Sequence, residues 1–323
     1  MWVEKWKVEQ KARLNLLLAQ NCAHATLLSL EDVFRRRNPS VLQAATNFEG
    51  GVVGCGETCG VVTGGVLGIG ALLYTQAFEN REVREKAILR LARDYKSWFE
   101  GRFGTSVCRE RTSVDFWKTR GLVRYLLPGD KLLKCLNHIG QAVWFLSQRI
   151  RTEVQRPSLS RGNGGGGVES PLEPHCCFTV LRRLAPARVE SDHALAAATT
   201  GLAGGVALSG SVCGALLGGI LNLGLHWGYD PRSVGVAGIV AAFVRGHRNL
   251  VRPSSTNVPR EAFARSRALT DHFRQRFGSL RCRDIAGRVF STSEQLRVFL
   301  RESRDCQAVL SWCEEESRSL GKS

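Results

Sequence analysis

The chain has 323 residues, a hydrophobic fraction of 43% and a formal net charge of +16. It is long enough for two domains of ordinary size, each with its own core, and its hydrophobic fraction is normal for a globular protein. The charge favours an acidic protein or a nucleic acid as partner, but the basic clusters lack the interleaved aromatic residues of a single-strand stacking platform.

The N-terminal residues carry acidic side chains and no apolar run, so we expect neither a secretory signal nor a transit peptide. We therefore predict an intracellular and cytoplasmic location. Eleven cysteines in such a chain indicate thiol, metal or redox chemistry rather than a secreted disulfide framework.

The first third of the chain predicts helices around a glycine-rich loop. Leucine and alanine recur at helical spacing over residues 3–37, which include Cys22, and a short helix is expected over 40–48. After the loop, an apolar run predicts a helix to about Tyr74. Thr58 is its expected N-cap, which places Cys59 in the first turn, where the helix dipole favours an anion.

Two further cysteines follow in predicted helices or at their ends. A charged amphipathic helix is expected over 81–100, and Gly104 is a predicted C-cap that turns the chain into a loop with Cys108. Cys135 lies in a helix that begins near Asp130. Residues 157–174 contain four consecutive glycines with serine and proline, so we predict a flexible linker between domains 1–156 and 175–323.

The second half repeats the first. Residues 204–224 align with residues 50–70 without a gap, and both stretches centre on Cys-Gly-x-x-x-Gly-Gly. Ser211 is the expected cap here. The segment Arg276-Phe-Gly-Ser-Leu-Arg-Cys282 matches Arg102-Phe-Gly-Thr-Ser-Val-Cys108, and Cys306 is expected in a helix that starts near the capping-box pattern at 291–294. An insertion of roughly 20 residues is expected near 245–263, since only the second copy carries this segment.

Each copy thus holds four cysteines in the same order, which are the candidate redox thiols or metal ligands: Cys22, Cys59, Cys108 and Cys135, then Cys176, Cys213, Cys282 and Cys306. Glycines at helical spacing beside them could approach a cofactor or another backbone: Gly60, Gly64, Gly214 and Gly218. Cys55, Cys177 and Cys313 fall outside the shared set, and their role stays open. His24 and His175 occur at different offsets from the first cysteine and are interpreted as structural.

The order of these motifs resembles the C-GCAxxG-C-C family, which is named for a suspected redox role. The second copy carries Cys213-Gly-Ala-Leu-Leu-Gly218, and the first has Val61 in place of the alanine. The resemblance implies a small helical domain with four functional cysteines, here duplicated in tandem. Some relatives are fused to haem-binding segments, but no Cys-x-x-Cys-His occurs here, so we do not predict covalent haem.

Four such thiols could act in two ways. They could bind an iron-sulfur cluster or zinc, or they could form reversible disulfides with an unknown redox partner. In the second case Cys59 or Cys213 is the expected attacking sulfur. The alternative from another class is a non-catalytic interaction or scaffold protein, with buried structural cysteines and a basic partner-binding surface.

The fold prediction is all-α, with two homologous helical-bundle domains that pack face to face through their central glycine-rich helices as a pseudo-dimer. Residues 194–225 and 58–78 contain no charged side chain and are long enough to span a bilayer. They are dominated by Gly, Ala, Ser and Thr, so we interpret them as buried central helices and keep two membrane helices as a third alternative.

Overall fold

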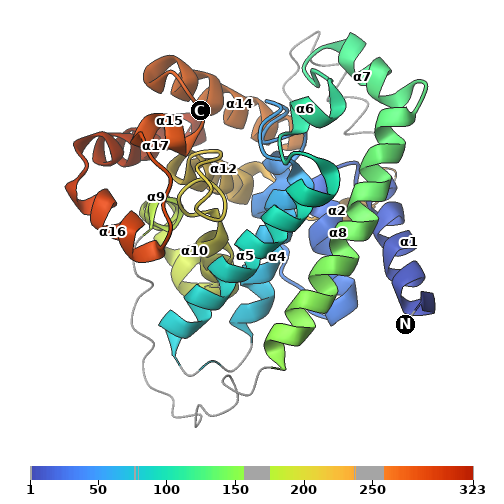
Figure 1. The fold of residues 1–323 in the computed structure, drawn as a ribbon. Helices are drawn as coiled ribbons and strands as arrows, with labels where there is room; N and C mark the ends of the chain where they lie inside the picture. Colours follow the sequence, from blue (N-terminus) through green and yellow to red (C-terminus); the bar gives the residue numbers. More distant parts are fainter. Residues whose placement is uncertain are drawn as a thin grey trace.

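The computed structural model describes residues 2–75, 78, 80–155, 175–235, 237 and 258–322. Within these residues the chain forms helices and no strands, which confirms the all-α prediction (Figure 1). The predicted linker 157–174 lies outside the described residues. So do residues 245–257 of the predicted insertion, while its last residues begin a helix.

The first repeat starts with two helices where the sequence predicted one helical region. Helix α1 spans Trp2–Ala19 and α2 spans Cys22–Phe34. Between them Gln20 has a positive φ of 51°, and the side chain of Asn21 accepts hydrogen bonds from the first backbone amides of α2. Asn is a strong N-cap, so a new helix begins here rather than the old one continuing.

The remaining helices of the first repeat include the four that were predicted: α3 (Pro39–Ala44) with the 3-10 helix η1 (Ala45–Phe48), α4 (Gly60–Tyr74), α5 (Arg81–Phe103) and α8 (Asp130–Val154). Two short helices were not predicted: α6 (Cys108–Thr112), where a loop was expected to carry Cys108, and α7 (Thr119–Leu126). Gly104 caps α5 with a φ of 89°, as predicted, because glycine adopts this left-handed region without strain.

The described second repeat has no counterpart of α1, and it has two short helices between the counterparts of α2 and η1, where the first repeat has α3 alone. Its helices are α9 (Cys176–Leu184), α10 (Pro186–Ser191), α11 (His193–Ala198), η3 (Thr199–Leu202), α12 (Gly214–Trp227), α14 (Val258–Phe277), α15 (Cys282–Ala286), α16 (Ser293–Glu302) and α17 (Arg304–Lys322). The predicted position of Cys306 was wrong. The helix capped by Thr292 ends at Glu302, because Ser303 adopts an extended conformation, and Cys306 lies in α17.

The central helices α4 and α12 are the buried axes of the two repeats. Helix α4 packs on α2, α5 and α8, and α12 packs on α9, α14 and α17. A Cβ atom on Gly64 would lie 2.6 Å from the carbonyl oxygen of Ala23, and one on Gly218 would lie 2.6 Å from that of Cys177. These two glycines are therefore packing residues that let one helix backbone touch another. No helix in the described part of the chain is long and apolar enough to cross a membrane.

The two repeats interlock reciprocally. Helix α4 packs on α11 and η3 of the second repeat, and α12 packs on α3 and η1 of the first. A Cβ atom on Gly70 would overlap the carbonyl oxygen of Ala197, and one on Gly224 would overlap that of Ala44. The main contacts of each central helix across the repeat boundary are thus with the short helices of the other repeat, rather than with the other central helix as expected.

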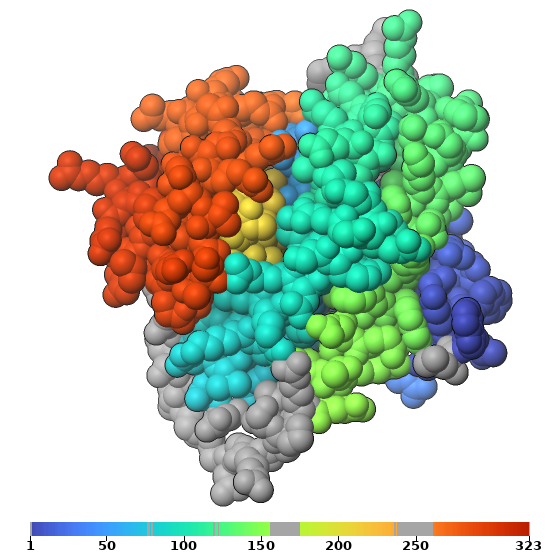
Figure 2. All heavy atoms as spheres, viewed as in Figure 1, coloured from blue at the N-terminus to red at the C-terminus, as the bar shows by residue number. Residues whose placement is uncertain are grey.

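The repeats lie side by side in the space-filling view, where orange and red residues of the second repeat meet teal residues of the first (Figure 2). Across this boundary Glu57 forms an ion pair with Arg281 at 3.1 Å, and Asn47 donates a hydrogen bond to Ser266 at 2.9 Å. The contact between repeats therefore includes polar bonds as well as the interlocked glycines.

Candidate functional site

The structure places three of the four cysteines of each repeat at the start of a helix. Cys22 begins α2, Cys59 is the N-cap of α4, Cys108 begins α6, and Cys135 lies in the second turn of α8. The second repeat matches at the first three, with Cys176 at the start of α9, Cys213 at the N-cap of α12 and Cys282 at the start of α15, while Cys306 lies in the first turn of α17. All eleven cysteines are free.

The predicted caps of the central helices were wrong. Cys59 and Cys213 are themselves the N-caps, so Thr58 and Ser211 lie before the helices. Thr58 instead forms an isolated antiparallel β-bridge with Val107, and Val212 forms the equivalent bridge with Arg281. In each repeat the residue before the central helix pairs with a second loop, and no side chain caps the helix there.

This bridge holds two thiols next to each other in each repeat. The backbone amide of Cys59 donates to the carbonyl of Ser106 at 2.8 Å, and the amide of Cys108 donates to the carbonyl of Glu57 at 2.7 Å. In the second repeat Cys213 and Cys282 make the matching bonds, at 2.8 and 2.7 Å. Two loops distant in sequence are thereby fixed with their cysteines at one place.

The glycine-rich loop before the bridge has an unusual backbone. Five consecutive residues, 50–54, have positive φ values between 51° and 77°, and residues 204–208 have values between 50° and 79°. For Val52 and Val53 this conformation is strained, since a β-branched side chain in the left-handed region is rare. Such strain persists where the surrounding structure fixes it, and it is concentrated at functional sites.

The loop makes room for the thiols and directs amides at them. A Cβ atom on Gly51 would lie 2.7 Å from the Cβ of Cys108, and one on Gly205 would lie 2.8 Å from the Cβ of Cys282. The backbone amide of Gly50 lowers the pKa of Cys22, and that of Gly204 lowers the pKa of Cys176, although other causes raise both pKa values overall.

The glycine that follows each central cysteine has a specific role. A Cβ atom on Gly60 would overlap the sulfur of Cys22, and one on Gly214 would overlap the sulfur of Cys176. The Cys-Gly pair of the motif therefore brings a second thiol against the first turn of the central helix. Gly60 and Gly214 approach a thiol, whereas Gly64 and Gly218 approach a neighbouring helix.

The first repeat stabilises a thiolate at Cys59. The Cys22 thiol, as a hydrogen-bond donor, lowers the pKa of Cys59 to about 5 against the opposing effect of burial, and the Arg111 guanidinium and the Val61 backbone amide lower it further. The pKa of Cys22 is raised well above its ordinary value by the same bond and by burial. Burial also raises the pKa of Cys108 and of Cys135. One of the four sulfurs is thus ionised near neutral pH.

Five polar or aromatic side chains surround these thiols. Arg111 contacts Nδ1 of His138, and its guanidinium lies 4.7 Å from the ring centre of Phe99. Tyr125 of α7 donates to the Cys135 sulfur and so opposes the effect of burial on the pKa of Cys135. The hydroxyl of Tyr95 donates to the carbonyl of Val61 at 2.8 Å.

The sequence analysis missed these neighbours because it searched for what the repeats share. The two repeats carry different residues at the positions of these neighbours, and that difference was the available signal. Arg111, three residues after Cys108, corresponds to Ile285, three residues after Cys282. His138, three residues after Cys135, corresponds to Val309, three residues after Cys306.

The thiols of the second repeat remain protonated. Burial is the main cause that raises the pKa of Cys213 to about 12 and that of Cys176 to about 11. Burial also raises the pKa of Cys282 far above its ordinary value. Burial, rather than a hydrogen bond from the neighbouring thiol, is the main influence on the pKa of Cys213, and an isoleucine takes the place of Arg111. The corresponding sulfurs therefore have different acidities in the two repeats.

The three cysteines outside the shared set have structural contacts. The sulfur of Cys55 accepts a hydrogen bond from Arg267 of the second repeat at 3.2 Å, so it lies at the contact between repeats. Cys177 and Cys313 are fully buried, at positions where the first repeat has Ala23 and Ala142. They are best explained as core residues.

Both histidines next to the first cysteines are buried and structural. Nδ1 of His175 accepts a hydrogen bond from the amide of Phe178 and caps α9, as Asn21 caps α2. Burial lowers the pKa of His175 to about 3 and that of His24 to about 4. Both rings are therefore neutral at physiological pH.

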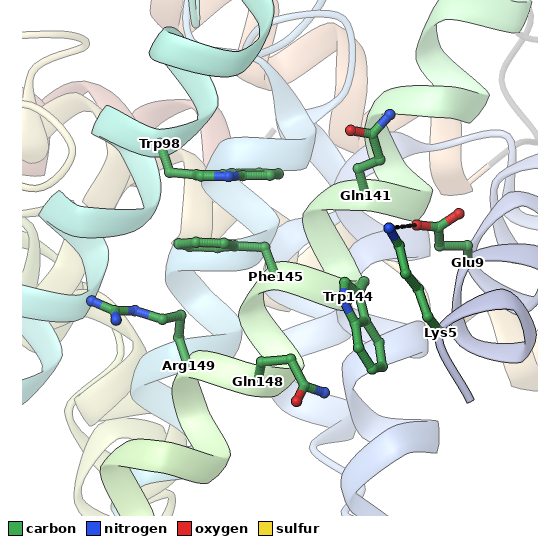
Figure 3. Close-up of a pocket in the computed structure, with 8 residues that line it drawn as sticks. All are labelled: Lys5, Glu9, Trp98, Gln141, Trp144, Phe145, Gln148 and Arg149. Carbon is green, nitrogen blue, oxygen red and sulfur yellow. Dashed lines mark ion pairs between the residues drawn. The ribbon is translucent and has the colours of Figure 1, made fainter. Parts of the chain in front are cut away.

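A surface pocket lies beside the first thiol site, between α1, α5 and α8. Figure 3 shows the rings of Trp98 and Phe145 parallel to each other on one side of the pocket, and their centres are 4.2 Å apart. On the other side, Lys5 and Glu9 of α1 form an ion pair. In the second repeat the equivalent positions are His272 and Glu316, and Nδ1 of His272 lies 2.7 Å from a carboxylate oxygen of Glu316. The aromatic pocket is thus a feature of the first repeat.

The thiols of the described residues are not arranged as a metal site. Among the described residues, no group of three or more His, Cys, Asp or Glu side chains is close enough together to hold a metal ion. In this arrangement the residues do not fit the four-ligand zinc site expected as one alternative, and we derive no step through a metal.

Comparison with known proteins gives one match. The family model described as "Putative redox-active protein (C_GCAxxG_C_C)" matches residues 20–148 and again residues 175–316. No curated protein and no solved structure matches the chain. The two matches cover more than half of the chain and the eight equivalent cysteines, and we conclude that the chain belongs to the C-GCAxxG-C-C family as a tandem duplication.

Proposed function

We propose that the first repeat is a thiol-based redox centre in which Cys59 is the reactive thiolate and Cys22 is its disulfide partner. The observation that carries this proposal is the acidity of Cys59, because the thiolate is the nucleophile in thiol-disulfide exchange. The second repeat, whose thiols stay protonated, contributes structure rather than chemistry.

The proposed reaction is the reduction of a disulfide substrate. The Cys59 thiolate attacks one sulfur of the substrate, the substrate S–S bond breaks, and the departing sulfur leaves as a thiolate that takes up a proton. The Cys22 thiol then loses its proton and attacks the Cys59 sulfur. The second substrate sulfur leaves, and a Cys22–Cys59 disulfide remains, so two electrons have passed to the substrate. A dithiol reductant would restore the two thiols by the reverse exchange.

Arg111 is the residue that favours the ionised state of Cys59 without taking part in bond exchange. It is partly buried, acts on the Cys59 sulfur and contacts His138, so solvent screens its charge less than that of an exposed arginine. Cys22 and Cys135 are partly exposed, whereas Cys59 is 3% exposed. Because the attacking sulfur is so buried, we expect small disulfides to react faster than disulfides of folded proteins.

The test is to equilibrate the full chain with dithiothreitol at a series of reduced-to-oxidised ratios, and to identify the disulfide by mass spectrometry after the free thiols are trapped. We expect a Cys22–Cys59 disulfide that forms reversibly, and Cys59→Ser should abolish it. Cys213→Ser is the matched control and should leave it unchanged. Inert thiols in the folded protein would instead support the non-catalytic scaffold, with its basic surface bound to an acidic protein or a nucleic acid.

A second candidate function is an iron-sulfur centre, which would require one set of four thiolates to move closer together than they lie in the described residues. One observation favours it: the amides of Gly50 and Gly204 are directed at Cys22 and Cys176 in both repeats, and amide bonds to sulfur are typical of such sites. Iron and acid-labile sulfide would be measured in anaerobically purified protein. Stoichiometric iron that disappears in Cys59→Ser plus Cys213→Ser would favour this candidate over disulfide exchange.

A further inference from the structure

Helix α1 presents a second apolar face that nothing in the described structure covers. Its inner face packs on α2 and α8 through residues such as Ala12 and Leu16. Its outer face carries five exposed apolar residues, with exposures between 46% and 81%: Trp2, Val3, Trp6, Leu14 and Leu17. At 3.6 residues per turn these five lie within about one third of the helix circumference. They form a stripe with an aromatic part at Trp2, Val3 and Trp6 and an aliphatic part at Leu14 and Leu17, separated on the same face by the polar side chains of Gln10 and Arg13.

A smaller apolar patch lies at the other end of α8. Val123, Leu126, Leu127 and Leu133, around the turn from α7 to α8, are exposed by 41% to 68%. Helix α1 lies beside α8, with Glu4 of its first turn paired to Arg151 in the last turn of α8. Both apolar regions therefore lie along the α8 side of the first repeat, on the right in Figure 1.

Cations border both regions. Lys7 and Lys11 are exposed on α1 beside the stripe, and Lys118, Arg120, Arg124 and Lys134 are exposed around the α7–α8 turn. An exposed apolar face with tryptophans and flanking lysines is the pattern of a helix that lies in the interface of an anionic bilayer. Tryptophan in particular favours this boundary, because its ring is apolar and its N–H is polar.

We propose that α1 is a membrane-surface helix that docks the protein on an anionic lipid bilayer through its Trp2–Leu17 stripe, with the α7–α8 turn as a second contact. A second copy of the chain is the competing occupant of the stripe. Two copies that each carry a formal charge of +16 repel each other, whereas an anionic surface attracts the chain. This proposal does not depend on the proposed redox function.

The experiment is co-sedimentation of the full chain with vesicles of phosphatidylcholine that contain phosphatidylserine, compared with phosphatidylcholine alone. We expect binding to the anionic vesicles, a blue shift of tryptophan fluorescence, and weaker binding as salt is added. Trp2→Ser plus Trp6→Ser should lower the partition coefficient roughly tenfold or more, because two large apolar side chains no longer enter the interface.

The control is Val289→Ser plus Val298→Ser, which removes exposed apolar residues of the second repeat and should not change binding. Helicity by circular dichroism shows that each variant is folded, and Leu17→Ser gives an independent second test of the stripe. The proposal is overturned if the chain does not bind anionic vesicles, or if the tryptophan variant binds as tightly as the original. It is also overturned if the chain is a dimer that the tryptophan variant dissociates, because a second copy then occupies the stripe.

Discussion

The two thiol sites share a backbone and differ in their chemistry. Each has the left-handed glycine loop, the bridge that joins two cysteines, and a glycine that admits the sulfur of a third. Yet the pKa of Cys59 is lowered to about 5 by Cys22 and Arg111, while burial raises the pKa of Cys213 to about 12. The backbone therefore brings the sulfurs together, and the surrounding side chains decide whether one of them ionises.

The largest expected effect concerns the hydrogen bond that the Cys22 thiol donates to Cys59. Cys22→Ala removes the main cause of the low pKa of Cys59, and burial then dominates, so we expect that pKa to rise by about 3 units or more. The ultraviolet absorbance of the thiolate, followed against pH, measures the change. Cys176→Ala is the matched variant in the second repeat and should leave the pKa of Cys59 unchanged. If both variants raised the thiolate pKa equally, the two thiol sites would not differ as described.

The same shift has a consequence for stability. A group with a lowered pKa stabilises the fold fully above its unfolded pKa, near 8.5 for cysteine, and this contribution is lost as the pH falls towards about 5. Cys22 is protonated in both states below about pH 7.5, so it adds to the slope only at the upper end of this range. The free energy of unfolding, compared between the original chain and Cys22→Ala from pH 8.5 to 5, should therefore fall less steeply in the variant.

The next effect comes from exchanging the side chain that distinguishes the two sites. Arg111→Ile places the residue of the second repeat in the first, and the loss of a buried cation should raise the pKa of Cys59 by about 1–3 units. Formation of the Cys22–Cys59 disulfide at neutral pH should slow accordingly. Arg111→Lys keeps the charge and should restore part of the acidity; a variant with isoleucine that reacts at the original rate would exclude this role of the guanidinium.

A smaller effect comes from the histidine cap of the second repeat at acid pH. The pKa of His175 is lowered to about 3 by burial, so below pH 6.5 only the unfolded state takes up its proton, and stability falls as the pH falls. His175→Asn installs the cap that the first repeat uses and should remove about 2 kcal/mol of the loss between pH 6.5 and 5. Urea unfolding at several pH values measures the slope, and an unchanged slope would mean that His175 is already protonated in the folded state.

The smallest effect concerns the glycine beside the thiols. In Gly60→Ala the new Cβ overlaps the sulfur of Cys22 and lies 2.7 Å from the carbonyl oxygen of Phe48, so we expect a loss of about 1–2 kcal/mol in the free energy of unfolding. Gly101, inside α5, has no atom within 4 Å of its Cβ position, and Gly101→Ala should gain about 0.5–1 kcal/mol. If Gly60→Ala and Gly101→Ala lowered the free energy of unfolding equally, packing around Cys22 would not be the cause.

The sequence predicts the elements well and the neighbourhood of the thiols poorly. The helix to Tyr74, the cap at Gly104 and the helix from Asp130 follow from local patterns, and the structure has all three. The predicted N-cap at Thr58 was wrong because Thr58 pairs with Val107 of a distant loop instead of capping the helix that follows it. The contact of Arg111 with His138 joins α6 to α8 and has no local pattern that would reveal it.

The comparison of the two copies was still the most informative sequence signal. It identified eight equivalent cysteines, which the structure gathers into two groups of four. It could not show that the two groups differ in the acidity of their thiols. The acidity of a buried thiol depends on charges and hydrogen bonds within a few ångströms, and those contacts come from residues that the copies do not share.

The reciprocal contacts of Gly70 with Ala197 and of Gly224 with Ala44 have a consequence for how such a chain can diverge. In a dimer of two identical chains every substitution appears twice, so neither site could lose its arginine without the other. Here the halves are separate stretches of one chain, and each central helix still needs the carbonyl surface of the other half. The second thiol set can therefore give up its chemistry while the half that carries it stays indispensable to the fold.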